Sequence, residues 1–220
     1  MSEKYLVVGA GKSGVAAIDL LLRLGKDCLL YDGNKDLDIT ALKASHSNWD
    51  SVQIIAGDLD DSVLEDCTIA VLSPGVPTDL PVVDAMRSHG LKIWGEVELA
   101  YQLGKGQVCA ITGTNGKTTT TALTGEIMKT YFNSTFVVGN IGIPYTGVAD
   151  QTKEDSVVVA EISSFMLETI DAFHPHVSAI LNITPDHLNR HHTMENYILA
   201  KENITKNQTE KDIVILNYDD

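Results

Sequence analysis

The chain has 220 residues, of which 44% are hydrophobic and 6% aromatic, so it can bury a substantial core in one large domain or two small ones. Its formal net charge is −14, and the acidic residues are spread along the whole chain. Because no basic run offsets them, the charge disfavours a nucleic-acid groove or an anionic membrane as a partner. No apolar run approaches the roughly 18 residues of a membrane span, and the N-terminal "YLVV" is too short for a signal peptide.

The cysteines, Cys28, Cys67 and Cys109, are odd in number and lack the CxxC spacing of metal and redox motifs. Cys28 and Cys109 stand inside apolar runs, where a reduced cysteine behaves as a small hydrophobic residue. Together with the lack of a membrane span in the sequence, this usage predicts a cytoplasmic protein with reduced thiols.

Apolar, β-rich runs alternate with helical segments over residues 1–95. Strands are predicted at 4–10, 28–32, 52–57, 69–75 and 91–95, and helices at 15–24 and 82–89. Gly25 and Gly90 stand where helix ends favour a positive φ. Strands that alternate with helices of this length predict a parallel, doubly wound α/β sheet.

A second series of the same kind follows residue 96. Its predicted strands cover 107–113, 134–140, 156–162, 177–183 and 212–218, and its helices cover 117–131 and 194–206. The stretch "LGKGQ" at 103–107 is a plausible joint between the two series. We therefore expect two α/β domains, at residues 1–95 and 96–220.

The first glycine motif, "GAGKSG", places Gly9, Gly11 and Gly14 between a predicted strand and a predicted helix. Such a loop lets the backbone approach a pyrophosphate at a helix N-terminus, where negative charge is favoured. Asp32 ends the next strand and can accept a hydrogen bond from a ribose hydroxyl or a base N–H. The pattern favours a nucleotide site, with NAD as one option, over a turn that only packs strand against helix.

The second motif, "TGTNGKTTT", is more specific, because a glycine turn leads into a lysine and threonines at the start of a helix. The amides of such a loop cradle phosphates, Lys117 can reach the β and γ oxygens, and the Thr118 hydroxyl can bind Mg²⁺. The general ATPase pattern has a glycine where this chain has Ile111, so most GTPases and motor ATPases are disfavoured.

The loop G-T-N-G-K-T resembles the ATP loop of the Mur ligases, which build bacterial cell-wall precursors. Four more stretches, "LSPGVP", "GNIGIP", "EISSFMLE" and "NITPDHLNRH", resemble segments of that family in the same order, so the resemblance covers essentially the whole chain. It is closest to the members that add D-glutamate to UDP-N-acetylmuramoyl-L-alanine. It implies a Rossmann-like domain that holds uridine diphosphate, followed by an ATP-binding α/β domain of the P-loop type.

The activity implied by the resemblance is ATP-dependent amide formation in peptidoglycan precursor synthesis. The substrate carboxylate attacks the γ-phosphate to give an acyl phosphate, and the amine of D-glutamate then displaces phosphate. Family members carry a third, C-terminal domain that binds the amino acid, whereas this sequence stops two residues after an apolar strand. We therefore expect a piece of a longer, monomeric ligase that does not turn over alone.

The matched motifs carry the expected site residues. Those of the ATP loop are Gly113, Thr114, Asn115, Gly116, Lys117, Thr118 and Thr119. Those expected to contact the sugar nucleotide are Gly11, Lys12, Ser13, Gly14, Asp32, Ser73 and Asn140. The expected catalytic residues are Lys117, Glu161, His187 and Lys201.

Two Mg²⁺ ions are implied, one held by Thr118 and Glu161 and the other by His187 and Lys201. Glu161 ends an apolar strand that we expect beside the strand of the ATP loop, and a carboxylate there is a natural Mg²⁺ ligand. By resemblance Lys201 becomes carbamylated, since an ammonium cannot ligate a cation whereas a carbamate is an oxygen anion. The residues alone also allow Glu161 to be a solvent-exposed acid and Lys201 an ordinary lysine on a helix surface.

The histidines His187, His191 and His192 form a cluster that also suggests zinc. The metalloprotease motif H-E-x-x-H, however, needs a glutamate directly after His187, and Leu188 stands there. We therefore prefer Mg²⁺ to zinc.

Two positions depart from the family pattern, because Met166 replaces a glutamine and Asn189 replaces an aspartate. Neither change removes a principal ligand. Three other functions stay open, namely a relative that adds another amino acid, a non-catalytic nucleotide-binding module and an NAD-dependent oxidoreductase. The last of these leaves the second glycine loop unexplained.

Overall fold

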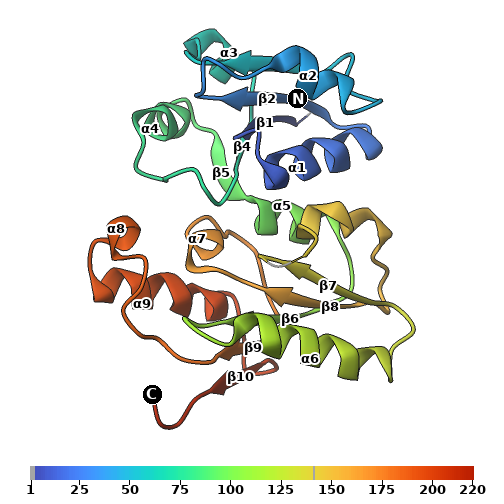
Figure 1. Ribbon diagram of the computed structural model, residues 1–220, viewed down its shortest axis with the longest axis vertical. Helices are drawn as coiled ribbons and strands as arrows, with labels where there is room; N and C mark the ends of the chain where they lie inside the picture. Colours follow the sequence, from blue (N-terminus) through green and yellow to red (C-terminus); the bar gives the residue numbers. More distant parts are fainter. Residues whose placement is uncertain (1–2, 141) are drawn as a thin grey trace.

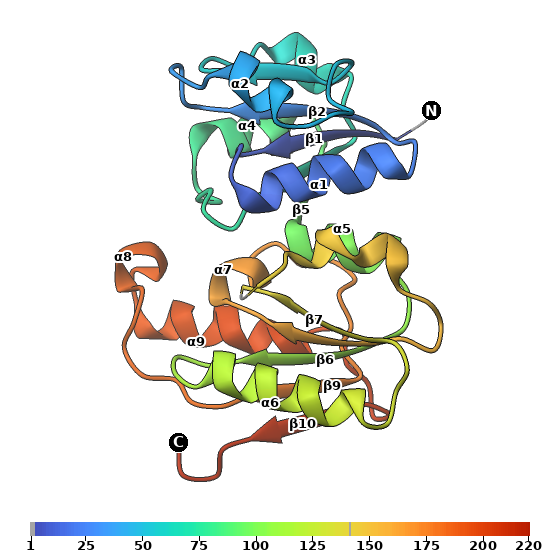
Figure 2. The same ribbon diagram turned by 45° about the vertical axis from the view of Figure 1, so that its right-hand side comes forward.

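The computed structural model describes residues 3–140 and 142–220, whose strands form two five-stranded sheets. Every strand pairing within these sheets is parallel. Figure 1 shows one sheet above the other with helix α5 (Glu96–Leu103) between them, and the turned view in Figure 2 agrees. The predicted α/β class is therefore confirmed.

The first sheet has the strand order β3-β2-β1-β4-β5. Its strands are β1 (Lys4–Val8), β2 (Asp27–Asp32), β3 (Gln53–Ala56), β4 (Ile69–Leu72) and β5 (Lys92–Gly95). Its helices are α1 (Lys12–Arg23), α2 (Ile39–Ala44), α3 (Asp61–Glu65) and α4 (Pro81–Ser88). The central strands β1 and β4 are apolar and buried almost throughout, as expected when helices cover both faces of a parallel sheet.

The second sheet has the order β10-β9-β6-β8-β7. Its strands are β6 (Gln107–Thr112), β7 (Thr135–Gly139), β8 (Val157–Glu161), β9 (Val177–Ile180) and β10 (Ile213–Leu216). Its α-helices are α6 (Lys117–Lys129), α7 (Ser164–Leu167), α8 (Leu188–His191) and α9 (Met194–Glu202). Short 3₁₀ turns are η1 (Tyr145–Gly147), η2 (Ala149–Gln151) and η3 (Asn203–Thr205).

Each glycine loop follows the middle strand of its sheet. β1 lies between β2 and β4, and β6 lies between β8 and β9. The chain leaves each middle strand toward one side of the sheet and later returns to the other, which opens a crevice at the carboxyl end of that strand. The fold therefore places both glycine motifs where α/β sheets bind their ligands.

The joint between the two sheets is apolar. The first sheet ends at Gly95, which supports the proposed division into domains at residues 1–95 and 96–220. One hydrophobic cluster joins Leu20 of α1 to Val97 of α5 and Tyr145 of η1. At its margin, Arg23 donates two hydrogen bonds to Asp150, at 2.7 and 2.9 Å. The two sheets are thus held together by apolar and polar contacts between their flanking elements, in addition to the connecting chain.

The thiols and the helices agree with the expectations from composition. All three cysteines are free, with Cys28 and Cys67 buried and Cys109 partly buried. Gly25 and Gly90 have φ values of 65° and 80° after α1 and α4. Within the described ranges, every helix is too short or too polar to cross a bilayer.

Helix α5 begins with buried acids that an amphipathic pattern does not predict. Glu98 accepts hydrogen bonds from the amides of three consecutive residues, 171–173, at 2.9–3.0 Å. Glu96 accepts from the amide and the hydroxyl of Thr146 with one oxygen, at 2.6 and 2.7 Å. Its other oxygen has no hydrogen-bond partner among the described residues. Burial raises the pKa of Glu96, because its charged form loses hydration.

We expect Glu96→Gln to raise the melting temperature at pH 8 by a few degrees, roughly the 2–4 °C that about 1 kcal/mol contributes in a chain of this size. Glutamine keeps the acceptor for Thr146 and removes a buried charge. Because the folded pKa of Glu96 is raised, the wild-type fold is favoured below the unfolded pKa and loses stability as the pH rises toward the folded one. The gain should therefore fade near pH 4.

Thermal unfolding between pH 4 and pH 8 measures this difference, with the exposed Glu65→Gln as a control for charge alone. A difference between Glu96→Gln and wild type that stays constant with pH contradicts the assignment.

Candidate active site

A cleft of about 400 Å³ lies where the carboxyl end of the first sheet meets the loop after β7. Of the residues predicted to contact a sugar nucleotide, six line it, namely Gly11, Lys12, Ser13, Asp32, Ser73 and Asn140. Lys12 also donates a hydrogen bond across the cleft to the carbonyl of Gly142. Residues that are up to 129 positions apart in the chain, from Gly11 to Asn140, therefore line the same cleft.

Asp32 and Ser73 shape the first glycine loop as well as lining the cleft. Asp32 accepts a hydrogen bond from the amide of Ala10 at 2.7 Å, and Ser73 donates to the carbonyl of Gly9 at 3.2 Å. Gly14 does not line the cleft. A Cβ atom on Gly14 would lie 1.8 Å from the Gly9 oxygen, so this glycine is required for packing α1 against the loop.

The second glycine loop wraps around its own lysine. Gly113 and Gly116 have φ values of 149° and 82°, a region that glycine adopts without strain. The Lys117 ammonium donates to the carbonyls of Gly113 and Thr114, at 2.8 and 2.9 Å. Thr118 and Thr119 follow in the first turn of α6, where the helix N-terminus favours an anion. The loop carbonyls therefore hold the Lys117 ammonium beside a helix N-terminus, an arrangement that is typical of phosphate-binding loops.

Asn182, which sequence analysis did not single out, clamps this loop. Its backbone carbonyl accepts from the Thr114 amide, and its side-chain oxygen accepts from the Asn115 amide, both at 2.8 Å. Its side-chain nitrogen donates to the Asn115 carbonyl at 3.0 Å. The available signal was its place at the start of "NITPDHLNRH".

Glu161 connects the phosphate loop to the cleft. It ends β8, and β8 pairs with β6 so that Glu161 lies opposite Ile111, as expected from sequence. Its carboxylate accepts from the Thr118 hydroxyl at 2.8 Å with one oxygen and from the Asn140 amide at 2.8 Å with the other. Only 1% of Glu161 is exposed, so the alternative of a solvent-exposed acid is excluded.

Lys201 is buried under the phosphate loop, with 1% of its surface exposed. Its ammonium donates to the Gly113 carbonyl at 2.8 Å and lies 4.6 Å from the centre of the Tyr197 ring. Burial, and next the charge of Lys117, lower the pKa of Lys201 to about 8. This excludes an ordinary surface lysine, and a lower pKa enlarges the fraction of neutral amine, the form that reacts with CO₂.

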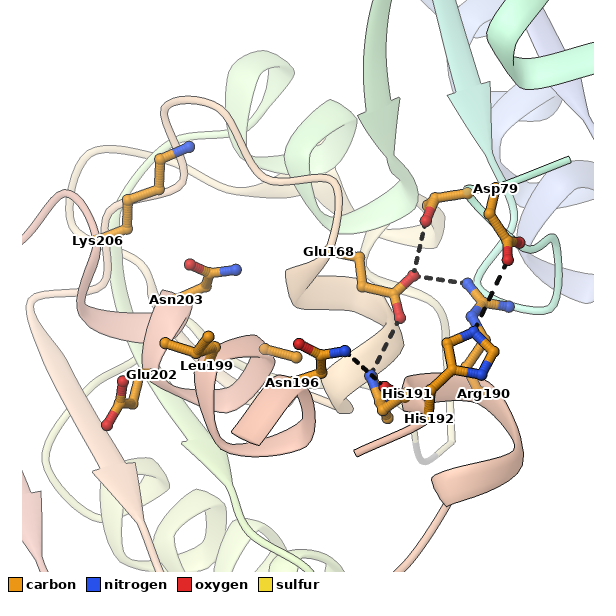
Figure 3. Close-up of a pocket in the computed structure, with 12 residues that line it drawn as sticks. Asp79, Glu168, Arg190, His191, His192, Asn196, Leu199, Glu202, Asn203 and Lys206 are labelled. Carbon is orange, nitrogen blue, oxygen red and sulfur yellow. Dashed lines mark hydrogen bonds and ion pairs between the residues drawn. The ribbon is translucent and has the colours of Figure 1, made fainter. Parts of the chain in front are cut away.

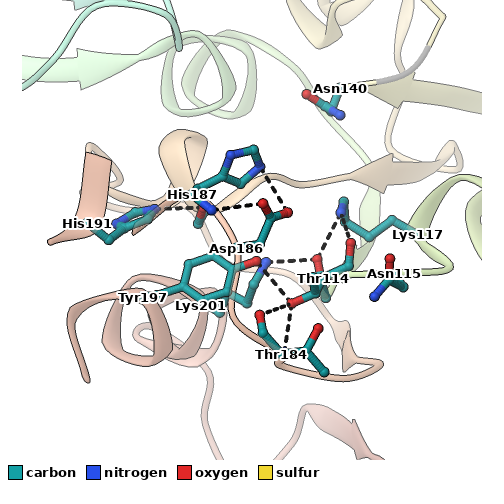
Figure 4. Close-up of polar contacts among 12 residues, drawn as sticks. Thr114, Asn115, Lys117, Asn140, Thr184, Asp186, His187, His191, Tyr197 and Lys201 are labelled. Carbon is teal, nitrogen blue, oxygen red and sulfur yellow. Dashed lines mark hydrogen bonds and ion pairs between the residues drawn. The ribbon is translucent and has the colours of Figure 1, made fainter. Parts of the chain in front are cut away.

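His187 lies at the start of α8 in a left-handed conformation, with φ 52°. Its ring nitrogen Nε2 lies 3.4 Å from the Asp186 carboxylate, and its ring centre lies 6.5 Å from that of Tyr197. Figure 4 shows Lys117, His187 and Lys201, from three different elements, grouped around Thr114 and Tyr197. The structure thus brings the predicted catalytic lysines and the histidine into one region.

The three histidines of the cluster lie in different surroundings. Among the described residues, no group of three or more His, Cys, Asp or Glu side chains is arranged to hold a metal ion. His191 is buried against the Ser164 hydroxyl at 2.9 Å, while His192 is exposed. Of the two departures from the family pattern, Met166 borders the 400 Å³ cleft and Asn189 is exposed.

Models of known families match the chain on both sides of the joint. Residues 3–95 match the N-terminal domain of MurD-like Mur ligases, and residues 111–220 match the Mur ligase middle domain. The chain belongs to the Mur ligase family.

Mur ligases with similar sequences carry the name UDP-N-acetylmuramoylalanine–D-glutamate ligase. Those of Lachnoclostridium phytofermentans and Lachnospira eligens are 58% and 55% identical over the whole chain, and that of Clostridioides difficile is 47% identical over 99% of it. The chain covers 48% of each of these proteins. It therefore spans about half the length of the curated relatives that it matches.

Solved Mur ligase structures share the fold at lower sequence identity. The UDP-N-acetylmuramate:L-alanyl-γ-D-glutamyl-meso-diaminopimelate ligase of Neisseria superposes with a TM-score of 0.62 and 15% identity, covering all of this chain and 72% of that one. MurC of Thermotoga maritima gives 0.56 and 22%, covering all of this chain and 50% of that one. These two similarities support the fold alone.

Proposed function

We propose that the protein is an ATP-dependent ligase that joins D-glutamate to UDP-N-acetylmuramoyl-L-alanine in the cytoplasm, as a monomer, during peptidoglycan precursor synthesis. The three relatives named above, at 47–58% identity, support this substrate pair. The site for D-glutamate is proposed to lie outside residues 1–220, on the C-terminal domain that the resemblance implies.

The observation that carries the proposal is a continuous line of contacts between the two glycine motifs. Thr118 in the second motif donates to Glu161, and Glu161 accepts from Asn140, which borders the cleft of the first motif. A phosphoryl donor on one loop and a sugar nucleotide on the other would therefore meet at Glu161 and Asn140. Such an arrangement suits transfer of a phosphoryl group to the substrate carboxylate.

The chain's own residues meet three demands of this chemistry. Lys117 and the loop amides can neutralise charge on the transferred phosphoryl group. Asn140 follows β7 and borders the cleft, so it can contribute to orienting the attacking carboxylate. The Asn115 amide donates to the side chain of Asn182, which holds the loop backbone in place before any ligand arrives.

The donor set fits a magnesium ion. The Thr118 hydroxyl and the Glu161 carboxylate offer oxygen ligands 2.8 Å apart beside the phosphate loop, and Mg²⁺ prefers oxygen. A second ion fits the His187 side only if Lys201 is carbamylated, because its ammonium would repel a cation. When bound, Mg²⁺ would supply positive charge to the phosphate oxygens of ATP.

Two rival functions predict different ligands. An NAD-dependent oxidoreductase would use the first glycine loop alone and would leave the cradle around Lys117 without a purpose. A Mur ligase for another amino acid would use both loops, but it would release ADP only when that other amino acid is supplied in place of D-glutamate.

We expect the full-length protein to release ADP and phosphate only when UDP-N-acetylmuramoyl-L-alanine and D-glutamate are both present. Titration calorimetry should show that the sugar nucleotide binds and that NAD binds more weakly, because the cleft extends from the first glycine loop to Asn140 in the second domain. Coupled ADP assays with a panel of D- and L-amino acids measure the specificity. Tighter binding of NAD than of the sugar nucleotide, or turnover with another amino acid only, would overturn the respective part of the proposal.

A further inference from the structure

Arg190 and Glu168 form a polar bridge between the two domains. Arg190, in α8, donates to the Glu168 carboxylate at 2.7 Å and to the backbone carbonyl of Val76 in the first domain at 3.1 Å. The same Glu168 oxygen accepts from the hydroxyl of Thr78, also in the first domain, at 3.4 Å. Figure 3 shows Glu168 and Arg190 facing one another in a second cleft, which has a volume of about 690 Å³.

The environment of this bridge makes it stronger than a surface ion pair. The side chains of Arg190 and Glu168 are each only 15% exposed. The guanidinium lies 5.0 Å from the centre of the Phe165 ring, which fixes its orientation, and His191 lies 3.6 Å from the second Glu168 oxygen. A charged hydrogen bond that is shielded in this way contributes more than one in open solvent.

The carbonyl that Arg190 holds belongs to a turn of the proposed sugar-nucleotide site. The Val76 amide donates to the Ser73 carbonyl at 2.9 Å, which closes the turn Ser73–Val76. From this turn Ser73 donates to the carbonyl of Gly9 in the first glycine loop. Contacts therefore run from Arg190 through the turn to the loop expected to hold the pyrophosphate.

The opposite side of Arg190 is tied to the catalytic turn. The Arg190 amide donates to the carbonyl of His187 at 2.9 Å, so both residues lie in one helical turn. His187 is proposed to face the ATP side of the site. A single residue therefore contacts a turn of the first domain with its side chain and the His187 turn with its backbone.

We propose that Arg190 is a positioning residue that sets the spacing between the sugar-nucleotide loop and the His187 turn. This inference rests on the proposed function for its kinetic consequence. Arg190 contacts the first-domain turn with its side chain but makes no hydrogen bond to the phosphate loop among the described residues. Its loss should therefore weaken the nucleotide-sugar site selectively.

The test uses Arg190→Met in the full-length protein, because methionine keeps apolar contact with Phe165 and removes the donors. We expect the KM for UDP-N-acetylmuramoyl-L-alanine to rise about tenfold and the KM for ATP to change by less than about twofold. Arg190→Lys, which keeps a charge beside Glu168 but has a single donor group, should shift the same KM less. Arg87→Met, at an exposed arginine paired with Asp84, is the matched control and should leave both KM values unchanged.

Amide hydrogen exchange gives a readout that does not depend on activity. In Arg190→Met, peptides covering residues 72–78 should exchange about tenfold faster, while peptides covering 113–118 should not change. If Arg190→Met does not fold, the KM values and the amide exchange of Arg190→Lys test the inference in its place. Unchanged exchange at 72–78, or an equal rise of both KM values, overturns the inference. If Arg190→Met shows the expected change in exchange but the wild-type protein ligates nothing, the inference about Arg190 stands and the proposed function is overturned instead.

Discussion

Lys201→Ala is expected to lower the ligation rate of the full-length protein by about 10²–10³-fold, the usual cost of losing a group that stabilises charge at a reacting centre. Lys201 is buried, and its amine lies beside the Gly113 carbonyl of the phosphate loop. As a carbamate it would present oxygen atoms to a cation on the His187 side, which neither alanine nor an ammonium can do. Steady-state ADP release measures the loss.

Added short-chain carboxylates should restore part of this activity, because acetate or formate can occupy the space of the missing side chain and supply the oxygen anion. Lys211→Ala, at an exposed lysine, is the control and should keep wild-type activity with or without added acid. If Lys201 acts only as a cation that donates a hydrogen bond to the Gly113 carbonyl, added carboxylates will not restore turnover. Near-normal activity of Lys201→Ala without added acid would show that the assignment is wrong.

Lys117→Ala should reduce ATP binding strongly and lower the ligation rate by at least about 10²-fold, because the ammonium is proposed to neutralise the charge that develops on the transferred phosphoryl group. The fold should survive, since Lys117 is partly exposed at the N-terminus of α6 and its removal opens no cavity in the apolar core. Calorimetric titration with ATP and with the sugar nucleotide separates the two sites. We expect only ATP binding to weaken, and an active variant would rule out the role given to this lysine.

The parallel sheets were predictable because apolar strands alternate with helices along the chain. The position of Glu161 beside the phosphate loop was also predictable, since adjacent parallel strands bring their carboxyl ends to one edge of a sheet. In contrast, α2 buries none of its residues and so has no apolar stripe to detect. Helix α5 was missed because Glu96 and Glu98, which interrupt its apolar pattern, are buried by hydrogen bonds from segments about 50 and 73 residues away.

The candidate site was predictable only where residue type and local motif coincide. Lys117 and Thr118 stand in a glycine loop, so their chemistry follows from adjacent residues. Asn182 contacts Asn115, 67 positions away, and Arg190 contacts Val76, 114 positions away. A local sequence pattern does not predict contacts between residues so far apart. The burial of Lys201 likewise depends on α9 packing against the loop and not on the helix itself.

One backbone carbonyl, that of Gly113, accepts hydrogen bonds from both Lys117 and Lys201. Because one acceptor serves two ammonium groups, the charge state of either lysine changes the electrostatic potential felt by the other. We therefore expect the two positions to be coupled, so that the cost of substituting one depends on what occupies the other. A double substitution should therefore cost a different amount from the sum of the two single substitutions, and a double-mutant cycle at these positions would measure that coupling.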